Sequence, residues 1–416
     1  MTLREEMELL CSDARSASRR LALCTTEEKN RILFRIAELI ERDGDEIIEA
    51  NKIDLAAAEA NGVPKTMLDR LSVSKARLDG ICDALRSLTE LEDPIGKSER
   101  WSRPSELEIT RTRVPLGVVA MIYEARPNVT VDSAALCIKT GNAVVLRGGK
   151  EAINTNKAIV AIIKRALDDC GMDPHSVELV TSVERESANI LMTMRGYIDV
   201  LIPRGGKGLI QSVVENATVP VIETGAGNCH LYVDAEADLD MAVKVAVNAK
   251  CSRPSVCNAI ETLLVHASVA AEFLPKLMTA LENYNVEIRG CPRTCVLLQC
   301  AKSATEEDYY TEYNDYILAI RVVDTLSDAI FHVNKYSTGH SEAIVTRSDA
   351  NAERFQSEIN SAAVYVNAST RFTDGGEFGF GAEIGISTQK LHVRGPMGLF
   401  ALTTEKYLIK GDGAVR

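Results

Sequence analysis

From residue 115 onward, short apolar runs typical of buried strands alternate with longer stretches whose apolar residues recur at helical spacing. This alternation predicts βαβ units, in which helices cover both faces of a parallel sheet. It occurs in two successive regions and therefore predicts two α/β lobes. The expected strands are 117–122, 143–146, 177–180, 198–202, 219–222, 260–265, 317–323, 342–345 and 362–366, and the expected helices are 131–138, 154–167, 188–194, 207–214, 239–249, 268–283, 326–335 and 350–359.

The first 90 residues have the periodicity of helices instead. Thr25 and Glu28 have the spacing of a capping box, and apolar residues from Ile32 to Ile40 fall on one helical face. Farther along, Leu107–Val114 alternates in the manner of a half-exposed strand. Such an extended segment can join subunits or can form a local hairpin, and the pattern does not separate these alternatives.

Composition excludes several classes of protein. A net charge of −12 argues against a protein that binds nucleic acid, whose surface would be basic. Eleven cysteines at irregular spacing, without a Cys-x-x-Cys pair, favour reduced thiols in the cytoplasm over a disulfide framework. The six histidines do not cluster with other ligands, so no metal site is expected. A charged N-terminus and the lack of a bilayer-length apolar run predict a soluble protein without a signal peptide.

Two turns in the first lobe combine glycine with basic residues at strand ends. Arg147-Gly148-Gly149-Lys150 follows one expected strand, and Arg204-Gly205-Gly206-Lys207 follows another. Glycine lets a backbone approach a ligand closely, and cations near a helix N-terminus favour phosphate. The turns therefore predict a phosphorylated cofactor, although neither is the G-x-G-x-x-G fingerprint of dinucleotide sites.

Three further polar residues lie in loops where local sequence leaves their roles open. Asn128 can cap a helix or donate to an oxyanion, and Glu223 can act as a base or pair with a cation. Cys257 lies in a loop between an expected helix and an expected strand. A thiol in that position can be a nucleophile or simply a small buried hydrophobe.

Six long segments together resemble the gamma-glutamyl phosphate reductases, a divergent branch of the aldehyde dehydrogenase superfamily. The resemblance covers nearly the whole chain in the expected order. It implies an aldehyde-dehydrogenase-like fold of two Rossmann-like lobes and a small β arm. The segments are Val114–Asp132, Leu146–Glu151, Ile222–His230, Arg253–Asn258, Val366–Gly376 and Ser387–Gly398.

The resemblance also implies domains and an activity. Residues 1–98 and 118–225 would bind NADPH, residues 226–390 would carry the nucleophile, and residues 99–117 and 391–416 would form an oligomerisation arm. The implied reaction is NADPH-dependent reduction of L-glutamate 5-phosphate to L-glutamate 5-semialdehyde and phosphate, the second step of proline synthesis from glutamate. A homo-oligomer and functional association with glutamate 5-kinase are expected as well.

The implied chemistry centres on Cys257, whose thiolate would form a thioester that is then reduced. Asn128 and the backbone N–H of Cys257 would stabilise the oxyanions. Glu223 begins the run Glu-Thr-Gly-Ala-Gly, whereas hydrolytic relatives have Glu-Leu-Gly-Gly-Lys there. Because of this departure, Glu223 is not assigned as a base. The implied cofactor contacts are Arg147, Gly148, Lys150, Gly205, Gly225 and Glu312, with Arg147 and Lys150 for a ribose 2′-phosphate, and the candidate substrate contacts are Arg126, Arg253, Arg371 and Asp374.

Two rival functions are also compatible with the sequence. One is an aldehyde dehydrogenase of another specificity, which would form an acid without phosphate. The other is a catalytically silent scaffold that keeps the fold. The presence of both Cys257 and Asn128 argues against the scaffold.

Overall fold

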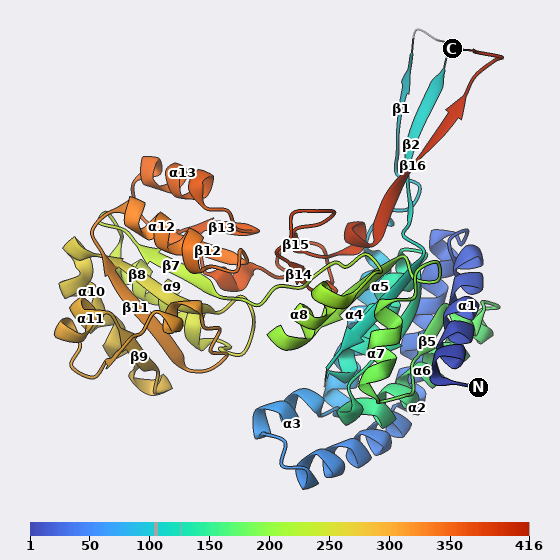
Figure 1. Cartoon of the computed structure of the whole chain (residues 1–416), viewed down its shortest axis with the longest axis horizontal. Helices are drawn as coiled ribbons and strands as arrows, with labels where there is room; N and C mark the ends of the chain where they lie inside the picture. The colour runs from blue at the N-terminus through green and yellow to red at the C-terminus, as the bar shows by residue number, and fades with distance from the viewer. Residues whose placement is uncertain (104–106, 125, 416) are drawn as a thin grey trace. The chain divides into compact units, whose positions relative to one another are not determined.

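The computed structural model describes residues 1–103, 107–124 and 126–415 and divides into two compact units. Unit 1 comprises Met1–Thr224, Gly379–Gly385 and Met397–Arg416, and unit 2 comprises Gly225–Phe378 and Ile386–Pro396. The predicted boundaries placed residues 379–385 in the catalytic domain, whereas here they pack with the first unit. Figure 1 shows the elements of both units, which are described separately below.

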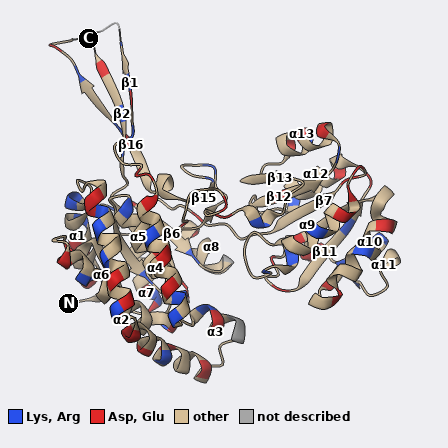
Figure 2. Cartoon of the chain, turned by 180° about the vertical axis from the view of Figure 1, so that it is seen from behind, with Lys and Arg blue, Asp and Glu red and all other residues tan. Residues whose placement is uncertain are grey.

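Unit 1 begins with a helical segment, as the sequence predicts. The predicted capping box is confirmed, because the Thr25 N–H donates to Glu28 Oε2 over 2.8 Å and the Glu28 N–H donates to Thr25 Oγ1 over 3.2 Å. Thr2 and Glu5 form the same motif one helix earlier. The helices are α1 (Leu3–Leu21), α2 (Thr26–Ala60), α3 (Lys65–Leu71) and α4 (Lys75–Glu90). Figure 2 shows acidic and basic residues interspersed along α2.

A four-stranded parallel sheet in the order β5-β4-β3-β6 forms the centre of unit 1. Val118, Ala120 and Ile122 of β3 pack on one face in a cluster that includes Met7 and Cys11 of α1. The alternating residues of β3 are equally buried, so both faces are covered. The elements are β3 (Val118–Tyr123), α5 (Pro127–Lys139), β4 (Ala143–Arg147), α6 (Ile153–Asp169), β5 (Val177–Leu179), α7 (Arg185–Met192), β6 (Val200–Arg204) and α8 (Lys207–Asn216).

The predicted strand at 219–222 is wrong. Only Val221 bridges to Leu201, through hydrogen bonds in which Leu201 donates to Pro220 and Ile222 donates to Leu201. Pro220 has no N–H to extend a ladder, and this explains why an apolar run stops at a single bridge.

Unit 2 contains a seven-stranded parallel sheet in the order β10-β9-β11-β8-β7-β12-β13. Leu231 and Val233 of β7 belong to the core on one face, whereas Tyr232 belongs to the core beneath α12 and α13 on the other. Strands β7, β9, β10, β14 and β15 and helix α11 were not predicted. The elements are β7 (Cys229–Val233), α9 (Leu239–Cys251), β8 (Ile260–His266), α10 (Ala267–Leu281), β9 (Glu287–Gly290), α11 (Pro292–Leu297), β10 (Lys302–Ser303), β11 (Ile317–Val323), α12 (Leu326–Tyr336), β12 (Ser341–Val345), α13 (Asp349–Glu358), β13 (Ala363–Val366), β14 (Ile386–Ser387) and β15 (Gly395–Pro396).

A three-stranded antiparallel sheet extends from the body of unit 1 (Figure 1). Its central strand, β2 (Glu108–Pro115), pairs with β1 (Ser98–Ser102) on one side and with the C-terminal β16 (Thr403–Lys410) on the other. The predicted arm covered 99–117 and 391–416; its residues 104–106 and 416 lie outside the described residues, and 391–396 belong to unit 2. Short 3₁₀ helices complete the chain at 150–152, 174–176, 282–284, 307–310, 370–372 and 399–402.

Candidate active site

Cys257 lies in the loop that connects α9 to β8 and is partly exposed. The loop is turned tightly, since the Ala259 N–H donates to the Val256 carbonyl over 3.0 Å. Cys257 precedes β8 and therefore lies at the amino end of that strand, opposite to the carboxyl edge where parallel sheets usually bind ligands. The Cys257 thiol nevertheless lies on a loop with access to solvent, as a nucleophile requires.

The backbone of Gly227 packs directly against Cys257. A Cβ atom on Gly227 would lie 1.6 Å from the Cys257 carbonyl oxygen and 2.4 Å from its Cα. The Gly227 N–H donates to Glu312 Oε1 over 2.8 Å. Glu312, which the resemblance assigns to a ribose, therefore also holds the segment behind the nucleophile. Gly225 meets a similar constraint, because its Cβ would lie 2.4 Å from the side chain of Thr388.

Asn258 fastens the other side of the loop. Its Nδ2 donates to the Thr373 carbonyl over 2.9 Å, and its own carbonyl accepts from Thr370 Oγ1 over 2.6 Å. Arg371 donates through one guanidinium nitrogen to Asn258 Oδ1 and through Nε to Ser252 Oγ over 3.0 Å. Part of the Arg371 guanidinium, predicted to bind substrate, is therefore used to shape the loop.

Three residues that the resemblance assigns to the site, Arg253, Cys257 and Asp374, each lie within electrostatic range of Arg371. Burial lowers the pKa of Arg371, and Arg253 lowers it further, whereas Cys257 and Asp374 act in the opposite direction. Arg253 and Asp374 are exposed. Asp374 also accepts from the Gly376 N–H over 2.8 Å and so closes its own turn. Two cations beside Cys257 make this loop a suitable place for an anionic substrate.

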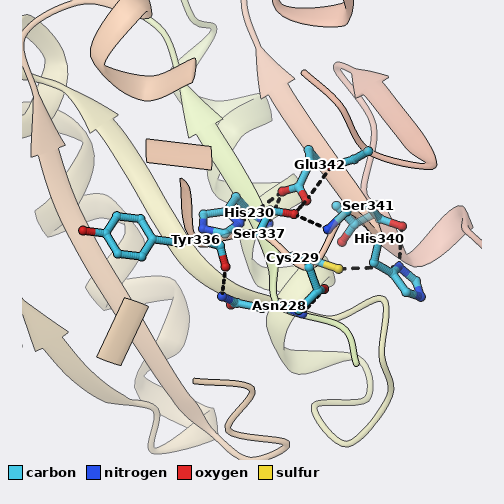
Figure 3. Close-up of polar contacts among 12 residues, drawn as sticks. Asn228, Cys229, His230, Tyr336, Ser337, His340, Ser341 and Glu342 are labelled. Atoms are coloured by element: carbon cyan, nitrogen blue, oxygen red, sulfur yellow. Dashed lines mark hydrogen bonds and ion pairs between the residues drawn. The ribbon is translucent and has the colours of Figure 1, made fainter. Parts of the chain in front are cut away.

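A buried polar network includes Cys229, His230, His340 and Glu342 (Figure 3), and it contacts Cys257 through Cys229. Cys229 Sγ lies 3.1 Å from the Cys257 carbonyl oxygen and 3.7 Å from His340 Nδ1. Next to Cys229, the His230 N–H donates to Glu342 Oε2 over 2.7 Å. His230, Cys229 and Glu342 are fully buried, so they act as scaffold rather than as contacts to substrate. Sequence reasoning did not assign Cys229, since its contact with Cys257 joins segments far apart in the chain.

Asn128 occupies the second position of α5, at the carboxyl end of β3. It is not the helix cap, because Arg126 takes that position and Pro127 begins the helix. The exposed Asn128 amide donates from Nδ2 to Asp132 Oδ2 over 3.2 Å. Burial is the main cause that raises the pKa of Asp132 to about 6. The asparagine is thus held at the strand end by a carboxyl group that titrates near neutrality.

The turn after β4 contains Arg147, Gly148 and Lys150. The guanidinium of Arg147 donates to the carbonyls of Val183 and Glu184, each over 3.1 Å, which occupies much of its donor capacity. A Cβ on Gly148 would lie 2.2 Å from a side-chain nitrogen of Asn156, so glycine is needed there for packing. Lys150 is exposed at the start of a 3₁₀ helix. Lys150 is therefore the more accessible of the two predicted cations.

A carboxylate already occupies the turn after β6. Glu124 Oε2 accepts from the Gly206 N–H over 2.9 Å, at the N-terminus of α8. A Cβ on Gly205 would lie 2.7 Å from the same carboxylate. The exposed Glu124 thus occupies the position predicted for phosphate. Strands β4, β3 and β6 are adjacent and end in register, so the predicted residues of unit 1 share one carboxyl edge.

Other kinds of site have no support in the part of the chain that the structure describes. Among the residues of known placement, no group of three or more His, Cys, Asp or Glu side chains could hold a metal ion. No described helix combines the length and apolarity needed to cross a bilayer. The eleven cysteines, all of which lie among the described residues, are reduced.

Comparison with known proteins identifies the family. The profile of the aldehyde dehydrogenase family matches residues 2–294. The gamma-glutamyl phosphate reductase of Heliobacterium modesticaldum is 55% identical over 417 aligned residues, which cover 100% of both chains. The chain belongs to the gamma-glutamyl phosphate reductase family. The enzyme of that name from Carboxydothermus hydrogenoformans is 55% identical and covers 99% of this chain and 100% of its own.

Solved structures agree with this family. The crystal structure of gamma-glutamyl phosphate reductase from Thermotoga maritima has a TM-score of 0.95 and 49% identity, and covers 98% of this chain and 99% of its own. A glyceraldehyde-3-phosphate dehydrogenase from Methanocaldococcus jannaschii, solved with NADP, shares the fold with a TM-score of 0.73 at 16% identity, and covers 98% of this chain and 95% of its own. The predicted aldehyde-dehydrogenase-like fold is confirmed, and the protein is an oxidoreductase of a family that uses NAD or NADP.

Proposed function

We propose that this protein reduces L-glutamate 5-phosphate to L-glutamate 5-semialdehyde with NADPH and releases phosphate, in the synthesis of proline from glutamate. The observation that carries the proposal is full-length identity of 55% to gamma-glutamyl phosphate reductases. The partly exposed Cys257, on a loop fastened from several sides, supplies a nucleophile in keeping with it.

The proposed chemistry begins at the Cys257 sulfur. Its thiolate attacks the acyl carbon of the substrate, the C–O bond to phosphate breaks, and a thioester remains. Charge develops on the acyl oxygen during attack, and the Asn128 amide and the Cys257 N–H are the proposed donors to it. Loss of one such donor raises the barrier by about 3 kcal/mol. For this role the Asn128 amide has to turn away from Asp132, or donate its second N–H to the acyl oxygen while the first stays bonded to Asp132.

The residues at the carboxyl edge of unit 1 fit a phosphorylated dinucleotide. Exposed Lys150 follows two glycines at a strand end, a donor set suited to phosphate. When bound, NADPH supplies the hydride that reduces the thioester. Lys150 is proposed to hold the ribose 2′-phosphate, with Arg147 keeping the turn in shape as well as adding charge. Gly148, Gly205, Gly225 and Glu312 remain the other proposed cofactor contacts.

Substrate binding is assigned to the cations around the reacting carbon. Arg253 and Arg371, in unit 2, are proposed to hold the phosphate or carboxylate, and Asp374 the ammonium group. Arg126, at the start of α5, is proposed as a further anion contact. We also propose that the enzyme works in the cytoplasm, assembles through its arm, and receives its unstable substrate from glutamate 5-kinase.

Replacement of Cys257 by Ser tests the function directly. In the reverse direction, the wild-type protein is expected to reduce NADP with glutamate semialdehyde only when phosphate is present. The Cys257→Ser variant should lose this turnover while it still binds NADPH, as followed by calorimetry. Phosphate-independent formation of acid would instead support the rival aldehyde dehydrogenase, and full activity of the variant would exclude the thioester route.

A further inference from the structure

A buried ion pair joins the two ends of the Cys257 loop. Lys250, near the end of α9, precedes the loop, and Glu261, in β8, follows it. Lys250 Nζ lies 2.5 Å from Glu261 Oε2, and both side chains are 0% exposed. The pair therefore closes the loop at its base, where the helix and the strand leave the core.

Stability alone does not account for this pair. Removing two charges from water costs several kcal/mol per ion, and apolar residues of similar size often stabilise a core equally well or better. Burial raises the pKa of Glu261, which reflects this cost. Although its desolvation is costly, such a buried pair is well suited to fix one geometry of the chain, because its hydrogen bonds are directional.

A second connection leads from Glu261 to the nucleophile. Glu261 Oε1 accepts from the Asn314 N–H over 3.2 Å. Two residues earlier, Glu312 accepts from the N–H of Gly227, whose backbone packs on the Cys257 carbonyl. Glu261 thus orders the segment 312–314 that supports the loop from behind, while Lys250 holds it at its entry.

We propose that Lys250 and Glu261 are a positioning pair that fixes the Cys257 loop so that the thiol is presented in a single orientation to the acyl carbon. The proposal rests on Cys257 being the nucleophile. Neither side chain reaches solvent, so both act through the loop and neither touches substrate.

The decisive variant is the double replacement Lys250→Met with Glu261→Leu, which removes both charges and leaves neither partner unpaired. We expect kcat to fall roughly 10- to 100-fold with KM little changed, because a displacement of about 1 Å at a reacting atom has an effect of this size. The rate of alkylation of Cys257 by iodoacetamide, followed at that peptide by mass spectrometry across pH, should change in parallel. The melting temperature reports stability separately.

Glu261→Gln is the second variant, for the case in which the double variant folds poorly. It removes the carboxylate charge but keeps the side-chain volume and an acceptor for the Asn314 N–H. Lys29 and Asp93 provide a matched control in unit 1, with a 2.5 Å contact and side chains 1% and 8% exposed. Lys29→Met with Asp93→Leu should shift the melting temperature but leave kcat and Cys257 alkylation unchanged.

Wild-type kcat and alkylation in folded Lys250 and Glu261 variants would overturn the positioning role. That result would leave the proposed function intact, because the function fails only if Cys257→Ser keeps its turnover. An equal fall of kcat in the Lys29 control would also overturn it, since any buried pair would then have the same effect.

Discussion

At the scale of single residues, Gly227 leaves the Cys257 carbonyl the space that a methyl group would take. Gly227→Ala would place its Cβ 1.6 Å from that oxygen, a backbone atom that cannot move without the loop. We expect the variant to lose at least about 100-fold in kcat/KM through misplacement of the thiol, and about 1 to 3 kcal/mol of stability through overpacking. Steady-state kinetics and urea unfolding measure the two effects.

Gly80→Ala is the control for that substitution. Gly80 lies in α4, and a Cβ there would meet nothing within 4 Å. This variant should keep full activity and gain about 0.5 to 1 kcal/mol, since alanine favours a helix over glycine. Wild-type kinetics in Gly227→Ala would show that the loop can move without consequence for Cys257.

Asp132, in the first turns of α5 and bonded to Asn128, is expected to make the stability of the protein depend on pH. Its folded pKa of about 6 lies above its usual 3.8, so between these values the folded state binds the proton more firmly than the unfolded state. Stability should therefore fall as pH rises from about 4 through 6, by at most roughly 3 kcal/mol. The melting temperature of wild type, relative to Asp132→Asn, should decrease over this range. Parallel curves for the two proteins would contradict the assignment.

At the scale of elements, the sequence predicts what depends on local periodicity. The helices of the N-terminal segment and the strand at 317–323 follow from the spacing of apolar residues, and the structure confirms them. Strand β7 escaped prediction because polar His230 interrupts it; His230 is buried there only because Glu342, from β12, accepts its hydrogen bonds. The apolar run at 219–222 is the reverse case, since its spacing predicts a strand but Pro220 lacks the N–H that a ladder needs.

The residues of the site also divide into those that the sequence predicts and those that only the fold reveals. Cys257 and Asn128 could be selected because the family motifs include them, but their supports could not. Glu312 contacts Gly227, and Glu261 contacts Lys250, because the fold brings together segments that are distant in the chain or belong to different elements. Arg147 shows the opposite case, since its charge suggested phosphate while its guanidinium also binds the carbonyls before α7. Residue type gives the chemistry that is possible, and packing decides how much of it remains available.

At the scale of the whole molecule, β16 makes self-association a testable expectation. It lies at the edge of its three-stranded sheet, and its Tyr407, Leu408 and Ile409 are 55%, 46% and 59% exposed. An edge strand with large apolar side chains tends to pair with another chain unless it is covered. A second copy of this chain would cover it, in agreement with the predicted oligomerisation arm.

The double variant Tyr407→Asp with Ile409→Asp tests this expectation. Charges at these positions should make burial of the edge costly, so the mass measured by light scattering after gel filtration should fall to a smaller species. Lys406→Glu, on the same strand but already charged in the wild type, should keep the wild-type mass. A wild-type protein that is monomeric at micromolar concentration, or a double variant of unchanged mass, would contradict assembly through β16. Since the arm is separate from the Cys257 loop in the chain, Cys257 alkylation should continue at the wild-type rate in the smaller species, which would separate assembly from the chemistry of the thiol.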